Sequence, residues 1–238
     1  RLYGNAWAWS IYKNGMHGHI HVINPSKKDL RSLNRLSKLT DGDINFSTGN
    51  IESKLPMDKC YFASFRFLYL KNLSNIYKKI IITDVDSIIR KKVVFPKKDF
   101  SFFLREPLKT DDPWFYEGSK IAAGIVFINN YEIDNISLFQ TIYKKKLYKL
   151  YNDGNWKWMV DQRALLETVF ELKETSDPKI FSQFDSSDLS WEFQDNVPIW
   201  TGKGKRKFKN RRYLKEFRML KRDYCKHNIY HWLASLRS

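Results

Sequence analysis

Two acids separated by one residue are the first candidates for chemistry in this chain. They stand in the stretch IIITDVDS, where the apolar run 80–82 leads through Thr83 to Asp84 and Asp86. Two carboxylates just past the end of a strand can together hold a hard divalent cation, whose remaining positions are filled by phosphate oxygens and water. The stretch therefore predicts a metal site at Asp84 and Asp86 that also takes a phosphate-bearing ligand.

The structural alternative for these two acids is an ordinary polar junction between a strand and a loop. Their position favours function, because ligands of α/β sheets bind in the crevice at the carboxyl ends of the strands. Asp84 and Asp86 fall at such an end.

Apolar periodicity predicts the elements that must position the acids. Helical spacing favours helices over 5–13, 26–39, 57–77, 133–150 and 158–172, and short apolar or alternating runs favour strands over 19–23, 44–46, 80–82, 100–104 and 121–128. The uninterrupted apolar run at 80–82 is typical of a buried parallel strand. Helices and strands that alternate along the chain predict an α/β fold with a sheet covered by helices on both faces.

The net charge of +16 is concentrated near the C-terminus. Residues 203–222 hold eleven Lys or Arg and a single acid, Glu216. Such a field attracts acidic partners, and charge alone leaves nucleic acid, an anionic membrane surface and a phosphate-bearing small molecule open. Apolar residues at helical spacing in the same segment predict a basic amphipathic helix that either docks on its own domain or lies on an anionic membrane.

Cysteine usage and hydropathy bound the setting of the protein. Cys60 and Cys225 form no CxxC pair and no disulfide framework, which predicts two buried thiols in a reducing compartment, the cytosol. The longest uncharged apolar run, 121–128, is far shorter than the roughly 18 residues of a membrane-spanning helix. His17, His19 and His21 share one face of a predicted strand, but no carboxylate or cysteine in that run completes a metal-ligand set.

Four motifs follow one another along most of the chain. They are the helix 61–70 with IIITDVDS behind it, AAGIVFIN at 122–129, WMVDQ at 158–162 and WTGKGK at 200–205. In this order they resemble the motifs of nucleotide-sugar glycosyltransferases of the GT-A fold, particularly the retaining group that contains glycogenin and bacterial lipopolysaccharide glucosyl- and galactosyltransferases. Each motif alone is weak, and their order and spacing carry the resemblance.

The resemblance assigns roles to the first and last motifs. It implies that Arg66 reaches the donor and that Asp84 and Asp86 hold Mn²⁺, or Mg²⁺, against the donor diphosphate. The stretch WTGKGK lies where the family has its H-x-x-G-x-x-K diphosphate clamp, which assigns Gly202, Lys203 and Lys205 to the diphosphate. No histidine stands at the expected distance before Gly202 or Gly204, so the third protein ligand is missing or comes from elsewhere.

The two middle motifs belong to the transferred sugar. By resemblance Ala123 and Gly124 line the donor sugar, with Ala122 in place of the family's asparagine, and Asp161 with Gln162 lies beside the sugar and the acceptor as the catalytic pair. Structural alternatives stay open. Small residues also serve tight strand packing, an Asp near a helix start also serves as a cap, and the lysines of the last motif also suit a solvated basic linker.

For the fold, the resemblance implies a GT-A-like, Rossmann-type mixed sheet flanked by helices over 1–202. A basic C-terminal helical extension over 203–238 is expected to pack on the same domain. The fold begins with a strand that binds the base, whereas this chain begins with a helix. That strand is therefore expected upstream of Arg1, or the alignment fails at the start.

The leading function is a hexosyltransferase-like glycosyltransferase of polysaccharide biosynthesis. By resemblance its donor is a UDP-sugar, and its acceptor is a glycan or a lipid-linked glycan, with peripheral contact to the inner membrane face. One alternative is a nucleic-acid-binding protein that uses the basic and aromatic C-terminal segment. A weaker alternative is a haloacid-dehalogenase-like phosphatase with Asp84 as nucleophile and Asp86 as general acid, although Ser87-Ile88-Ile89 departs from that family's Gly-Thr.

Overall fold

The fold comes from a computed structural model, which describes residues 4–50, 59–105, 111–129, 133–155, 157–175, 181–184, 187–202 and 204–235. These residues divide into two compact units, each assembled from segments far apart in the sequence. The first unit takes its residues from 1–52, 84–93 and 186–238, and the second takes its residues from 53–83 and 94–185. The domain boundary at residue 202 that the sequence suggests stays a prediction.

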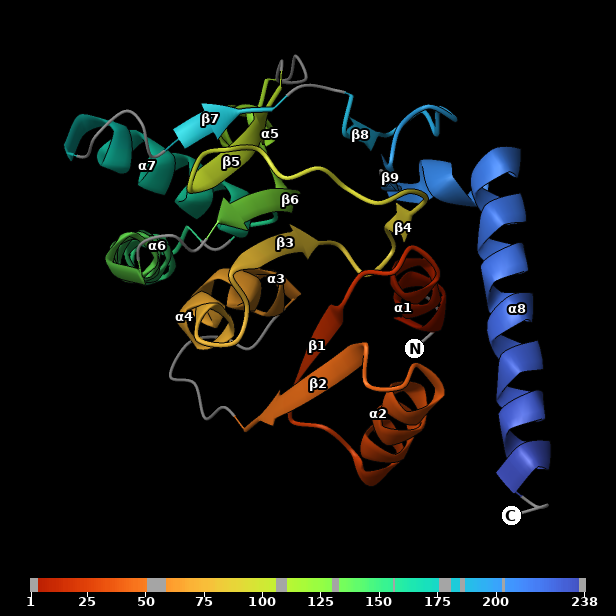
Figure 1. The fold of residues 1–238 in the computed structure, drawn as a ribbon. Helices are drawn as coiled ribbons and strands as arrows, with labels where there is room; N and C mark the ends of the chain where they lie inside the picture. Colours follow the sequence, from red (N-terminus) through yellow and green to blue (C-terminus); the bar gives the residue numbers. More distant parts are fainter. Residues whose placement is uncertain are drawn as a thin grey trace. The chain divides into compact units, whose positions relative to one another are not determined.

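The first unit begins with two helices that alternate with two strands (Figure 1). These are α1 (Gly4–Lys13), β1 (Gly18–Ile23), α2 (Lys27–Leu39) and β2 (Ile44–Gly49). Strands β1 and β2 pair in parallel, from Gly18 opposite Ile44 to Ile23 opposite Gly49. Ser26 begins α2 with a capping box, in which the Ser26 Oγ accepts from the Asp29 N–H and the Asp29 carboxylate accepts from the Ser26 N–H. The helices and strands predicted for this stretch are confirmed.

A small sheet and a long helix complete the first unit. Strands β4 (Ile88–Ile89), β9 (Ile199–Trp200) and β8 (Leu189–Ser190) lie in that order, with β4 antiparallel and β8 parallel to β9. The 3-10 helix η2 (Gly204–Phe208) leads to α8 (Arg211–Ser235). Helix α8 runs beside α1 (Figure 1), and the Trp9 ring lies edge-on to Tyr224 with centroids 5.9 Å apart. The predicted basic C-terminal helix is thus present.

The second unit is built on a mixed sheet with the strand order β3-β6-β5-β7. Its strands are β3 (Lys79–Thr83), β5 (Phe100–Leu104), β6 (Ile121–Asn129) and β7 (Phe181–Gln183). Strand β6 is antiparallel to β3 and β5, and β5 is parallel to β7. The helices are α3 (Lys59–Leu68), α4 (Leu70–Ser74), α5 (Pro113–Ser119), α6 (Ile133–Asn152) and α7 (Val160–Thr175). The predicted mixed α/β class is confirmed.

Two expectations for individual elements are wrong. Strand β3 is not a buried parallel strand, because within the described residues it lies at the edge of its sheet and pairs antiparallel with β6. Ile80 and Ile82 face the core while Ile81 is half-buried, so three consecutive isoleucines fitted either orientation. The helix expected over 57–77 is in fact two helices that meet at Tyr69, and residues 57 and 58 lie outside the described residues.

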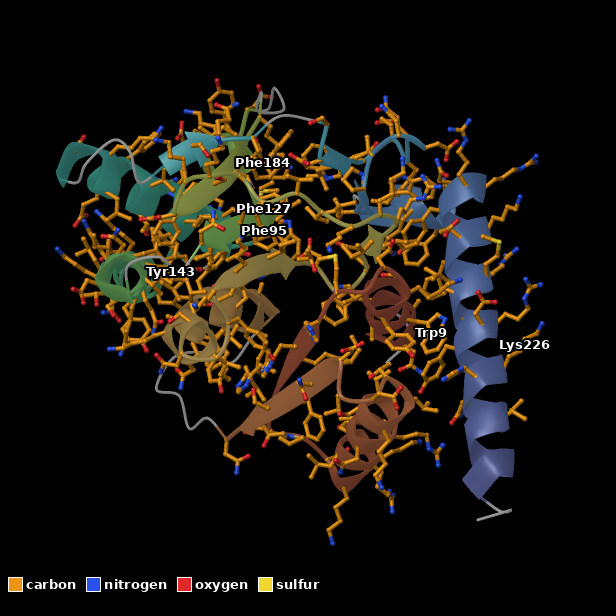
Figure 2. The ribbon with its side chains drawn as sticks, in the orientation of Figure 1. Trp9, Phe95, Phe127, Tyr143, Phe184 and Lys226 are labelled. Atoms are coloured by element: carbon orange, nitrogen blue, oxygen red, sulfur yellow. The ribbon has the colours of Figure 1, made fainter. Side chains whose placement is uncertain are left out.

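Aromatic side chains form the core of the second unit. The Phe100 and Phe139 rings are stacked 4.9 Å apart, and Phe67 lies 4.9 Å from Tyr143, all of them buried. Figure 2 shows Phe127 at the centre of a group with Phe95 and Phe184. Because such rings bury large areas and pack in defined geometries, they hold β5, β6 and α6 rigidly together.

The two cysteines differ in exposure, which corrects one prediction. Cys60 is buried in α3 as expected, but Cys225 is exposed on α8. The helical periodicity of α8 turns Tyr224 inward and therefore leaves its neighbour outside. Among the described residues, no helix has the length and hydropathy to cross a membrane.

Candidate functional site

The candidate residues gather in two clusters, one within each unit. The acidic-turn cluster in the first unit comprises Asp84, Asp86, Gly202, Lys207 and Tyr213. The Arg66 cluster in the second unit is formed by Arg66, Arg105, Ala123, Tyr143, Asp161 and Gln162.

The acidic turn joins β3 to β4. Strand β3 ends at Thr83 and β4 begins at Ile88, so both acids lie in the connection, as the sequence predicts. The Ser87 N–H donates to the Asp84 carbonyl at 2.9 Å and closes the turn. From α8 the buried Tyr213 hydroxyl donates to the Asp86 carbonyl at 2.7 Å. The turn is therefore fixed both by its own backbone and by α8.

The two oxygens of Asp86 have different surroundings. The Lys207 Nζ donates to Oδ2. Oδ1 is buried and has no hydrogen-bond partner among the described residues. Burial raises the pKa of Asp86, and the charge of Asp84 raises it further, while the Lys207 contact acts in the opposite direction. A buried acceptor without a donor is costly in a folded protein, so Oδ1 is suited to a ligand that supplies positive charge.

This donor set fits a divalent cation in part. Asp84 and Asp86 supply hard oxygen donors, and the orphaned Oδ1 is one of them. The described residues contain no group of three or more His, Cys, Asp or Glu side chains that could hold a metal ion. A cation at the acidic turn would therefore need further ligands such as phosphate oxygens and water.

The basic segment after β9 contributes a residue that sequence reasoning missed. Lys207 of η2 reaches Asp86 although 121 residues separate them. The signal was present, because Lys207 stands three residues after Gly204, the G-x-x-K spacing of the family's clamp. Of the predicted pair, Lys203 lies outside the described residues, and for Lys205 only the backbone in η2 is described.

Gly202 has a structural reason for lacking a side chain. A Cβ at this position would lie 2.7 Å from the Lys207 Cβ and 3.0 Å from its Cγ, far closer than ordinary contact. The missing side chain thus makes room for the stem of Lys207. Gly202 was predicted to contact a diphosphate, and in the structure it packs against the lysine that contacts Asp86.

Three predicted residues meet in the Arg66 cluster. The Arg66 guanidinium lies on α3, and its Nη1 donates to the Ala123 carbonyl of β6 at 3.4 Å. Its Nη2 lies 3.9 Å from the Asp161 Oδ2 of α7, with both side chains largely buried. The Arg66 Nε donates to the Ala63 carbonyl at 2.7 Å, which fixes the guanidinium plane. Residues from three separate elements are thereby brought together within one unit.

Asp161 and Gln162 occupy the first turn of α7, where a negative charge is favoured by the helix dipole. Asp161 reaches across to α3, so its role exceeds that of a local cap. The Gln162 Oε1 accepts from the Arg105 Nη2 at 3.2 Å. Arg105 directly follows β5 and was missed by sequence reasoning, because a lone arginine at a strand end carries no motif.

Tyr143 and Arg105 position Asp161 and Gln162. The Tyr143 hydroxyl of α6 donates to the Asp161 carbonyl at 3.4 Å, and Tyr143 is labelled in Figure 2. Burial, reinforced by the charge of Asp161, raises the pKa of Tyr143 well above its usual value, so the phenol stays neutral. Burial also lowers the pKa of Arg105, whose Nε donates to the Ser119 carbonyl.

Strained backbone precedes α7. Met159 has a φ of 77°, a left-handed conformation that residues other than glycine seldom adopt. Gly118 of α5 makes room for it, because a Cβ there would lie 2.9 Å from the Met159 Cβ. Such strain is retained where the surrounding structure imposes it, often at functional sites. Here it lies two residues before Asp161.

Gly124 lies next to the carbonyl that Arg66 contacts. Of the nine residues of β6, all described, Gly124 is the one that is not buried. This partial exposure on a strand otherwise inside the core is compatible with the predicted contact to a sugar, and tight packing stays the structural alternative.

A solved glycosyltransferase structure is similar to this chain over almost its whole length. The glycosyltransferase GlyE of Streptococcus pneumoniae TIGR4 matches with a TM-score of 0.61 and 12% identity, over 98% of this chain and 60% of that chain. A glycosyltransferase involved in the glycosylation of the major capsid of PBCV-1 matches 86% of this chain and 98% of its own, with a TM-score of 0.47 and 9% identity. No family model and no curated protein matches the sequence. The likeness to GlyE shows that this chain has a glycosyltransferase fold, and the chain spans 60% of the GlyE chain.

Proposed function

We propose that this chain is a glycosyltransferase of the GT-A type, related to the glycogenin and lipopolysaccharide glycosyltransferase group, that moves a sugar from a nucleotide-diphosphate donor to a hydroxyl of a glycan or a lipid-linked glycan. One observation carries the proposal. Arg66, Ala123 and Asp161 belong to three different motifs of that group, and they come together around one guanidinium in a chain with a glycosyltransferase fold.

The chemistry assigns a task to each cluster. Sugar transfer breaks the bond between the anomeric carbon and the diphosphate and joins that carbon to the acceptor oxygen, so negative charge develops on the leaving diphosphate. Positive groups aimed at that charge lower the barrier. Asp84 and Asp86 are proposed to hold Mn²⁺ or Mg²⁺, which would supply this stabilisation as a Lewis acid.

The chain's own residues do the rest of the work. Arg66, Lys203 and Lys205 are proposed to bind the phosphates. Asp161 and Gln162 are proposed to orient the sugar and the acceptor hydroxyl. Arg105 and Tyr143 act as positioning residues, because they contact Gln162 and the Asp161 backbone.

A UDP-sugar is the proposed donor, and the cytoplasmic face of a membrane is the proposed location. Helix α8 supports the membrane location, because Arg211, Lys215, Arg218 and Arg222 lie along one face of this helix. Among the described residues, the apolar Leu214 and Met219 lie between these bases on the same face. Basic side chains that flank apolar ones suit an anionic membrane surface, where a lipid-linked acceptor would be found.

Nucleic-acid binding is less well supported by the same helix. Base recognition by a basic segment needs exposed aromatic rings as stacking platforms. Tyr213 is 1% exposed and Tyr224 is 7% exposed, and both face the first unit. Phe208 alone among the described aromatic residues of 203–229 has a strongly exposed ring, at 52%.

Thermal unfolding of the chain tests the donor proposal. UDP, GDP, CDP and ADP would each be added with Mn²⁺ or with chelator. A ligand at a hundred times its dissociation constant stabilises by roughly 2.7 kcal/mol, which raises the midpoint by several degrees. We expect a Mn²⁺-dependent rise with UDP. A rise with none of the four nucleotides would contradict donor binding by this chain.

A further inference from the structure

Lys207 and Asp86 form the best-sheltered ion pair of the acidic turn. Their side chains are only 12% and 17% exposed, and the lysine ammonium donates to Asp86 Oδ2. Asp86 Oδ1 stays without a partner among the described residues. The carboxylate that the metal proposal requires is therefore already contacted by a cation that belongs to the chain.

The fold builds this contact in more than one way. Gly202 leaves room for the lysine stem, because a Cβ there would lie 2.7 Å from the Lys207 Cβ. Tyr213 holds the Asp86 backbone by a hydrogen bond to its carbonyl. The neighbouring Phe208 ring lies with its centroid 5.4 Å from the Lys207 Nζ. Acid and lysine are thus each held by a further residue of the same unit.

We propose that Lys207 is a built-in counter-cation that competes with a divalent metal for Asp86. The inference rests on the proposed role of Asp84 and Asp86 as a cation site and adds the residue that controls its affinity. An ammonium group has three donors and no lone pair, so it cannot share a metal as a ligand. It can only neutralise the carboxylate or repel the metal. In the absence of a diphosphate, Asp84 and Asp86 then bind metal weakly, since Lys207 already compensates the buried charge of Asp86.

Metal binding without nucleotide tests this competition directly. The dissociation constant for Mn²⁺ would be measured by electron paramagnetic resonance on the full chain and on Lys207→Met, which keeps the stem and removes the charge. An ammonium group and a metal ion held by the same carboxylate repel each other, and at such short separations this repulsion lowers the affinity by about tenfold or more. We expect Lys207→Met to bind Mn²⁺ at least about tenfold more tightly than the unmodified chain.

Three further variants make the result specific. Lys209→Met removes the same charge from an exposed position two residues away and should leave the affinity within about twofold, because exposed charges are screened. Gly202→Ala displaces the Lys207 stem and should tighten Mn²⁺ binding as Lys207→Met does. Adding Asp84→Asn and Asp86→Asn to Lys207→Met should abolish the gain.

The proposal would be overturned by a folded Lys207→Met protein, judged by circular dichroism, that binds Mn²⁺ no more tightly than the unmodified chain. It would also be overturned by an equal gain in Lys209→Met, which would reduce the effect to net charge. Neither outcome would remove the proposed sugar transfer, because donor recognition is measured separately by the Mn²⁺-dependent rise in unfolding midpoint with UDP.

Discussion

At the scale of single residues, Asp161 is the side chain on which the proposed transfer depends most. It lies 3.9 Å from the Arg66 guanidinium and its side chain is 11% exposed. Asp161→Asn keeps the shape of the side chain and removes its charge. We expect the rate of sugar transfer to fall by about a hundredfold or more, as with other single electrostatic groups of active sites.

The matched control for this variant is Asp153→Asn, the same substitution at an exposed position in the connection after α6. Its transfer rate should equal that of the unmodified chain. Donor binding, measured by the UDP-induced rise in unfolding midpoint, should survive in both variants. A rate within about twofold of normal in folded Asp161→Asn would exclude a direct part for this carboxylate.

Short motifs in the sequence contain several residues of the two clusters, and their proposed roles stay predictions. Asp84, Asp86, Asp161 and Gln162 stand in DxD and DQ, whose spacing is visible in the printed chain. Lys207 and Arg105 were missed because their roles come from partners 121 and 57 residues away. A contact over such separations depends on the tertiary fold, which local spacing does not reveal.

At the scale of elements, two histidines of β1 predict that the stability of the first unit depends on pH. The His19 Nε2 and the His21 Nδ1 lie 2.7 and 2.8 Å from the Ser47 Oγ of β2. Burial lowers the pKa of both histidines, and the charge of His21 lowers that of His19 further. The folded chain therefore binds a proton at His19 and at His21 less tightly than the unfolded chain does.

The sign of the effect follows from this difference. The two neutral histidines contribute their full stabilisation above 6.5, the pKa of histidine in the unfolded chain. This stabilisation is lost as the pH falls from there through the lower pKa values that both histidines have in the folded chain. We expect the unfolding midpoint to drop between about pH 7 and about pH 5. In the double variant His19→Gln with His21→Gln the drop should be smaller.

His17→Gln provides the control, because the His17 side chain is 71% exposed and its contact with Asp43 lies at the surface. Its midpoint should fall with pH as in the unmodified chain. Equal slopes in the double variant and the unmodified chain, followed by calorimetry, would show that the histidine pair does not carry the effect.

Element type was predictable over most of the described chain, and strand pairing was not. Helical stripes such as that of α2 and the apolar run of β6 are local patterns. The placement of β3 at a sheet edge depends on which later strand pairs with it, and that strand is β6, in the antiparallel direction. That strand begins at Ile121, nearly forty residues after β3 ends.

At the scale of the whole molecule, the uneven charge and its display on α8 are the main features. The chain carries +16, and α8 turns Arg211, Lys215, Arg218 and Arg222 to one side, while Tyr213 and Tyr224 are buried against the rest of the first unit. Lys226, labelled in Figure 2, is a further exposed base of this helix. From the sequence alone, the C-terminal helix could bind a membrane, bind nucleic acid or dock on its own domain. The buried Tyr213 and Tyr224 favour docking, with one basic face of the helix left exposed.

Vesicle binding measures the use of this face. Vesicles of neutral lipid with about a third of anionic lipid should sediment the unmodified chain at low salt, since each basic residue near such a surface contributes about 1 kcal/mol. Changing Arg211, Lys215, Arg218 and Arg222 to Gln should weaken this binding by two or more orders of magnitude. Changing four exposed bases of α2 to Gln removes an equal charge and should weaken vesicle binding far less. These bases are Lys27, Lys28, Arg31 and Lys38.

Equal losses in the two quadruple variants would contradict a specific membrane face on α8. Salt-dependent binding of RNA that survives in place of vesicle binding would instead support the nucleic-acid alternative.

The division into two units was beyond the sequence for a physical reason. Residues 84–93, which begin with the acidic turn, leave the second unit's β3 and belong to the first unit with α1 and α8. No proline- or glycine-rich linker marks this crossing in the sequence. The boundary is set by long-range packing, as when the Ser10 hydroxyl accepts from the Ile89 N–H at 3.1 Å.

The central claim is best tested by turnover of nucleotide sugars. A panel of UDP-, GDP-, CDP- and ADP-sugars would be incubated with the chain, Mn²⁺ and simple sugars as acceptors, so that the sugar passes to an acceptor hydroxyl or to water. Release of the nucleoside diphosphate would be followed by liquid chromatography. We expect release from a UDP-sugar by the unmodified chain, and loss of this release in Asp161→Asn and in the double variant Asp84→Asn with Asp86→Asn. Release that is equally fast in these folded variants, or no release from any member of the panel, would contradict the proposed sugar transfer.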